Sequence, residues 1–289
     1  MIENIIFKNK KIGEAISYLE EKSYREKDLY EAKKDFVDFL TKKISAVSKD
    51  YGGFQTKERL KNSIVNGVFG FQKSKNADEN HYNQFPIKKI ILAIKKSLQN
   101  AYYVLPSNKS VKIFILPTLQ MFVKNKMSGS SGYTPSGDSI HIYLSIKPAS
   151  YSKMIAAVKN TVVHEYNHTV RFQYFPNSSS MTLLESLIFE GLAENFTKEV
   201  ADKKLSPWAS SLNEKDAREI FNKIKPILNS ASRKIYYSVF FENKKFPLWA
   251  GYSIGYWMIR NFRKTNRNVN WPEIIRMSYM GIFKSSGWK

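Results

Sequence analysis

Cysteine is absent from this chain of 289 residues, so it can form no disulfide bond and offers no thiolate to a metal ion. A lack of cysteine is typical of proteins from a reducing compartment. The N-terminus, Met1 to Lys8, contains an acidic residue and an apolar run of only three residues, unlike a secretory signal. We therefore expect a cytoplasmic protein.

Long hydrophobic runs are also missing. The longest weakly polar stretch, Phe246 to Ile259, has fourteen residues and is interrupted by one proline and two glycines. A helix needs about 20 predominantly apolar residues to cross a bilayer, so we expect no membrane span. No glycine-rich phosphate loop stands between a strand and a helix, which argues against nucleotide chemistry.

Acidic residues are scarce beside basic ones: 25 against 46, for a net charge of +21. Such a charge is compatible with nucleic acid as a partner. The lysines, however, come in dispersed pairs such as Lys33-Lys34 and Lys95-Lys96, and no aromatic residues interleave with them as in a binding motif. We favour a solvated lysine-rich surface and leave the nucleic-acid alternative open.

Histidine is rare, and two of the four histidines flank a glutamate in the motif His164-Glu165-Tyr166-Asn167-His168. Residues i and i+4 share one face of a helix, so both imidazoles can bind one ion. Glu165 would lie beside the ion, where it can take a proton from a metal-bound water. This HExxH pattern predicts a zinc site, provided that it lies on a helix and that a third ligand is near.

The neighbouring sequence predicts the helix. Apolar Ile155, Val158 and Val162 recur at helical spacing, and neither glycine nor proline follows until Pro176. We expect a helix from about residue 152 to about residue 172.

A second helix should begin at Thr182, because Thr182 and Glu185 form a capping-box pattern that gives Glu185 a structural role. Glu190 and Glu194 lie one turn apart on this helix, and Glu190 follows mostly apolar residues. A carboxylate beside an apolar face is costly unless it is paired or binds a metal. A solvated helix edge is the alternative, but next to HExxH we favour a metal ligand.

The middle of the chain predicts strands. Val111 to Leu116 is rich in β-formers, Gly129 to Asp138 is dense in turn residues, and Ser139 to Ile146 alternates with period two. In the last segment His141 and Tyr143 face away from the aliphatic side chains.

Helices are expected on both sides of these strands: from about Gly13 to Ser48, from Pro86 onward, and after about Leu205. In the late segment, Gly251 and Gly255 would let one helix approach a neighbour closely. We predict an α+β fold with a helical N-terminal region, 1–105, and a second domain, 106–289.

HExxH, followed about twenty residues later by Glu-Gly-Leu-Ala-Glu at 190–194, is similar to the gluzincin metallopeptidases. Together with Thr-Leu-Leu-Glu-Ser at 182–186, it most resembles the bacterial YjaZ-type family of predicted zinc-dependent proteases. The strong similarity covers about residues 160–200. It implies a zincin-like fold, in which a small mixed sheet with an active-site edge strand precedes the HExxH helix and a mainly helical C-terminal part.

The resemblance also implies roles. His164, His168 and Glu190 would bind Zn2+, and Glu165 would act as the general base. Glu194 would orient a ligand histidine. The substrate would be a peptide or protein.

Two further roles follow from the same resemblance. Tyr252, with Tyr256 in reserve, would stabilise the oxyanion, although aromatic residues on an apolar helix also suit a core. His141 and Tyr143 would contact substrate from the edge strand. A solvent-facing position is the alternative for His141.

Rival interpretations remain. A di-iron carboxylate site needs a second Glu-x-x-His pair, and His81, with Asp78 before it in a polar loop, is a poor substitute. A metal-free basic binding protein, or a protease-like fold that acts as a chaperone or binding module, is left open. The Gly-x-Met-Glu-Asn signature of related aminopeptidases is absent, which favours internal cleavage. Nothing in the sequence indicates the oligomeric state.

Overall fold

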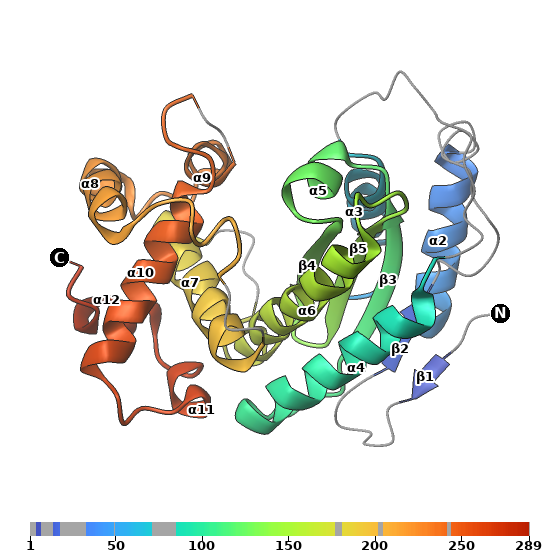
Figure 1. The fold of residues 1–289 in the computed structure, drawn as a ribbon, viewed down its shortest axis with the longest axis horizontal. Helices are drawn as coiled ribbons and strands as arrows, with labels where there is room; N and C mark the ends of the chain where they lie inside the picture. Colours follow the sequence, from blue (N-terminus) through green and yellow to red (C-terminus); the bar gives the residue numbers. More distant parts are fainter. Residues whose placement is uncertain are drawn as a thin grey trace. The chain divides into compact units, whose positions relative to one another are not determined.

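The computed structural model describes residues 4–6, 14–17, 33–48, 50–70, 85–176, 181–201, 205–241 and 244–288. The fold is α+β, with a mixed sheet and mostly helical content (Figure 1). The chain divides into two compact units, one formed by residues 1–102 and 107–169 and the other by residues 103–106 and 170–289. This division does not coincide with the domain boundary predicted near residue 105. His81 lies outside the described residues.

The first unit contains a five-stranded sheet of order β1-β2-β3-β5-β4. Its strands are β1 (Asn4–Ile6), β2 (Glu14–Ser17), β3 (Lys112–Thr118), β4 (Ser130–Ser136) and β5 (Ser139–Ser145). β2, β3 and β5 are parallel to one another, whereas β1 and β4 pair antiparallel with their neighbours. The helix expected from about residue 13 is therefore wrong at its start, where residues 14–17 form β2.

The edge of the sheet also differs from the prediction. β4, in the stretch that the sequence suggested to be turns, is an edge strand, and β5 lies inside the sheet. β4 accommodates Gly132 and Pro135 because an edge strand can leave one side unpaired, and its register with β5 is irregular between Tyr133 and Ser136. Pairing with a neighbour, rather than local composition, makes this segment a strand.

α2 (Lys33–Val47) and α3 (Lys57–Phe69) cover one face of this sheet (Figure 1). An apolar cluster lies between these two helices and the sheet, and it includes Phe114 and Leu116 of β3 and Tyr143 of β5. The helical members of this cluster are Phe36, Val37, Leu40, Ile44, Leu60, Ile64, Val68 and Phe69. Residues 36–69 therefore share a core with strands that the sequence assigned to another domain.

α4 (Ile87–Val104) and α6 (Tyr151–Tyr174) lie on the opposite face (Figure 1). The ring of Phe85 meets that of Tyr151 at 5.7 Å near the beginning of both helices. α4 begins after Pro86, as predicted, and buries its isoleucines, while the short α5 (Met121–Lys126) follows β3. α6 occupies almost the range expected from the apolar spacing.

The second unit is helical: α7 (Leu183–Val200), α8 (Glu214–Ile224), η1 (Lys225–Ile227), α9 (Arg233–Phe240), α10 (Ala250–Thr265), α11 (Trp271–Ile274) and α12 (Tyr279–Ser285). α7 and α10 touch at Gly191 and Gly255, where a Cβ on Gly255 would lie 2.1 Å from the Leu187 carbonyl oxygen. The predicted close approach is thus confirmed for Gly255, while Gly251 packs on the ring of Phe240. Among the described residues, no helix is long and apolar enough to cross a membrane.

Candidate metal centre

α6 carries the two histidines and the glutamate of the motif. They lie in a segment, Thr161 to Arg171, in which every residue is buried. A helix buried on every side is normally apolar, yet this one holds His164, Glu165 and His168, each less than 8% exposed. The two imidazole rings are 4.6 Å apart and nearly perpendicular. The helical repeat therefore does what the spacing predicted: it stacks both rings one turn apart on one face.

α7 carries Glu190, and its beginning is set by the predicted capping box. Thr182 Oγ1 accepts a hydrogen bond from the Glu185 backbone N–H, and Glu185 Oε2 accepts one from the Thr182 backbone N–H at 2.8 Å. Both interactions satisfy amide groups that have no partner within the helix. The carboxylate of Glu185 is therefore committed to the cap, and Glu190 stands just over one turn further along α7.

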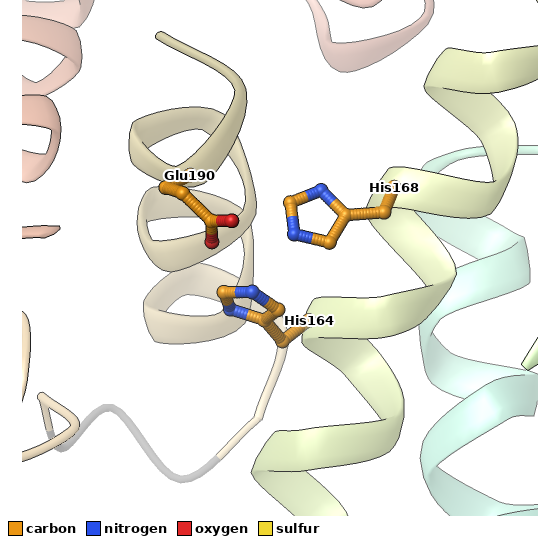
Figure 2. A group of neighbouring side chains, drawn as sticks. All are labelled: His164, His168 and Glu190. Atoms are coloured by element: carbon orange, nitrogen blue, oxygen red, sulfur yellow. The ribbon is translucent and has the colours of Figure 1, made fainter. Parts of the chain in front are cut away.

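His164, His168 and Glu190 form a group whose ligand atoms all lie within 4.8 Å of one another. Figure 2 shows the carboxylate of Glu190 directed toward the two imidazole rings. Two imidazole nitrogens and one carboxylate oxygen are a donor set that zinc accepts, and three protein ligands leave a fourth position open. This donor set fits a zinc ion, so the group could bind a metal.

Glu165 points from α6 to the edge strand. Thr134 Oγ1 on β4 lies 2.7 Å from Glu165 Oε2 and 3.0 Å from the Glu165 backbone oxygen. Gly132, two residues earlier, faces the same side chain. Sequence reasoning missed both β4 residues because glycine, serine and proline around them suggested turns, and no local signal marks Thr134.

Glu194 is buried on α7, one turn beyond Glu190. Ser206 Oγ donates to its Oε2 at 2.5 Å, and Trp208 Nε1 donates to its Oε1. A buried carboxylate without such donors would pay a large desolvation cost. The segment after α7 thus fixes this carboxylate, and the sequence offered no sign of Ser206 or Trp208.

The two tyrosines considered for oxyanion stabilisation have different surroundings on α10. Tyr252 packs against the rings of Trp208, Phe240 and Phe241. Tyr256 is fully buried, and its hydroxyl accepts a hydrogen bond from Lys198 Nζ at 2.8 Å. Of the two, Tyr252 is the one next to the indole that binds Glu194.

His141 and Tyr143 lie on the other face of the sheet. Paired residues of β4 and β5 share a face, so Gly132 and Ile142 face Glu165 while Tyr133 and His141 face away from it. His141 is fully buried between Phe54 and Phe114, with Nε2 3.1 Å from the Gly52 carbonyl oxygen. This position supports neither substrate contact nor a solvent-facing histidine.

Burial dominates the acid–base behaviour of both residues. It lowers the pKa of His141 from 6.5 to about 4, which keeps the imidazole neutral at pH 7. It raises the pKa of Tyr143, whose hydroxyl donates weakly to the Ser63 carbonyl oxygen in α3. Both side chains are parts of the core beneath α2 and α3.

The chain matches a known protein family. A sequence model of the family described as "Predicted Zn-dependent protease (DUF2268)" matches residues 91–284. No curated protein and no solved structure matches the chain. The matched range contains His164, Glu165, His168 and Glu190.

Proposed function

Because the chain belongs to the predicted Zn-dependent protease family, we propose that it is a zinc-dependent peptidase that hydrolyses peptide bonds. The observation that carries the proposal is the grouping of His164, His168 and Glu190 within 4.8 Å. The proposal includes a zincin-like fold of the gluzincin type, in which the third ligand comes from the helix after the HExxH helix.

Zinc held by these three residues would supply a water whose pKa is lowered towards ~7 and would polarise the scissile carbonyl. Glu165 takes the proton of that water as general base and passes it to the leaving amine. Its burial on α6 suits this task, because few waters compete for the carboxylate.

Two other residues complete the proposed mechanism. Glu194 fixes the orientation of a ligand histidine, with its own carboxylate held by Ser206 and Trp208. Tyr252 donates a hydrogen bond to the developing oxyanion. Tyr256 is fully buried, whereas Tyr252 is partly exposed and lies beside the indole that binds Glu194, so we assign the role to Tyr252.

The proposed substrate is a peptide or protein segment. His141 and Tyr143 are left out of the proposed site, because the sheet separates their side chains from Glu165. Edge strand β4 is the one that an extended peptide could join by main-chain hydrogen bonds.

Metal analysis combined with cleavage of a peptide library tests the proposal, with wild type compared to Glu165→Gln. We expect about one zinc per chain in both proteins, because Glu165 is not a ligand. Loss of a general base lowers kcat by about 10²–10⁴-fold. Full activity in Glu165→Gln would show the mechanism to be wrong. Wild-type protein that binds zinc but cleaves no peptide would favour a binding module instead.

A further inference from the structure

The carboxylate of Glu165 is held by a hydroxyl from another element of the first unit. Thr134 Oγ1 lies 2.7 Å from Glu165 Oε2, and both residues are about 6% exposed. A threonine hydroxyl has one proton to donate, and an ionised carboxylate is a stronger acceptor than a backbone carbonyl. The proton is therefore directed to Oε2, the nearer of the two oxygens.

This hydrogen bond selects one orientation of a side chain that could otherwise adopt many. Glutamate loses substantial rotamer freedom when it is ordered, so a contact that fixes its carboxylate has a cost to offset. A donor on Oε2 orients the other oxygen, Oε1, as well. The position of a general base decides its rate, since small displacements from the proton that it takes are costly.

Gly132 provides the space for this orientation. It faces α6 from β4, as Thr134 does, because residues i and i+2 of a strand share a face. A Cβ on Gly132 would lie 2.4 Å from Glu165 Cγ and 2.6 Å from Oε1. Any larger residue there would displace the carboxylate.

We propose that Thr134 is a positioning residue that orients Glu165 for proton transfer, and that Gly132 is required beside it. The inference rests on the proposed peptidase function. It assigns the edge strand a part in the chemistry, because the strand that an extended peptide could join also sets the direction of the base.

Docking of β4 on α6 is the simpler role for Thr134, and the structure contains a control for it. Ser130 Oγ of β4 and Thr161 Oγ1 of α6 are 3.0 Å apart and buried. This pair joins the same two elements by a hydrogen bond between two neutral hydroxyls, about one helical turn before Glu165. A variant without the Ser130 hydroxyl therefore measures how much a hydrogen bond between this strand and this helix contributes to the stability of the fold.

The experiment compares Thr134→Val, Thr134→Ser and Ser130→Ala with wild type in kcat, KM, zinc content and urea unfolding. We expect Thr134→Val to lower kcat by about 10-fold or more, with KM and zinc content within about 2-fold, because the base is less well oriented for proton transfer while binding is unchanged. Thr134→Ser keeps the hydroxyl and should restore kcat to within about 3-fold of wild type. Ser130→Ala should change kcat by less than about 2-fold.

Three results would overturn the inference. Thr134→Val could retain the wild-type kcat, could raise KM alone, or could lose no more activity than Ser130→Ala. Each would reduce Thr134 to a folding role while leaving the proposed peptidase intact.

A stability cycle separates failure of the inference from failure of the proposed function. Unfolding of Thr134→Val, Glu165→Ala and the double variant gives the coupling between the two side chains without any substrate. Coupling supports the hydrogen bond, and additive effects overturn the inference. Absence of cleavage by zinc-loaded wild type overturns the proposed function and, with it, the catalytic part of the inference.

Discussion

Polar side chains are buried on both faces of the sheet, but their surroundings differ between the two faces. Beneath α2 and α3, His141 is enclosed by aromatic rings and its imidazole is kept neutral by burial. On the opposite face, β4 directs Thr134 toward Glu165, next to the histidines of the candidate metal centre. The comparison shows that burial alone does not identify a functional histidine, because all three histidines of the described residues are buried. What distinguishes the pair on α6 is the carboxylate of Glu190, which lies with both imidazoles in one group of atoms that could hold a metal ion.

The largest expected effect separates these histidines by metal binding. Replacing even a residue that orients a ligand typically lowers metal affinity 10–100-fold, so His168→Ala should lower zinc affinity by more than about 100-fold. His141→Gln should bind zinc like wild type. Competition with a chromophoric chelator measures both affinities, and equal zinc loss in the two variants would contradict the distinction.

The next effect concerns pH. The folded-state pKa of His141, about 4, lies below its ordinary value of 6.5. As the pH falls below 6.5, His141 binds a proton in the unfolded chain but not in the folded chain. Its contribution to the free energy of unfolding is therefore fully present above pH 6.5 and is lost as the pH falls toward 4. For this fully buried group the loss is about 2 kcal/mol between pH 7 and pH 5.

Urea unfolding of the zinc-free protein at both pH values measures this loss, with His141→Gln as the control. The variant should be less sensitive to pH by about the same 2 kcal/mol. Identical pH dependence in the two proteins would show that His141 is not the group responsible.

The smallest expected loss of stability is that of Gly132→Ala, and Gly255→Ala provides the contrast. In Gly255→Ala the new Cβ meets the backbone oxygen of Leu187, so α7 and α10 must move apart, at a cost of about 1–3 kcal/mol. In Gly132→Ala it meets the side chain of Glu165, which can rotate, so stability should fall by less than about 1 kcal/mol. Thermal unfolding compares the two, and kcat should fall for Gly132→Ala despite its stability. If both variants lose the same stability, the distinction between a backbone contact at Gly255 and a side-chain contact at Gly132 is wrong.

Local patterns predicted much of the helical structure. α6 and α4 were visible from apolar spacing, and the start of α7 from its capping box, because helix contacts and caps involve residues three or four apart. The strands were less predictable. β2 and β4 depend on pairing with distant segments, and the composition around Gly132 pointed to turns.

The sequence by itself determined which side chains are present at which spacing: two imidazoles and a glutamate on α6, and further carboxylates on the next helix. It determined these because the period of a helix is set by its own backbone. Only the tertiary structure decided which carboxylate meets the histidines, which strand forms the edge and which hydroxyl holds Glu165. Those outcomes depend on contacts between residues far apart in the chain, whose free energy comes from packing and burial rather than from spacing.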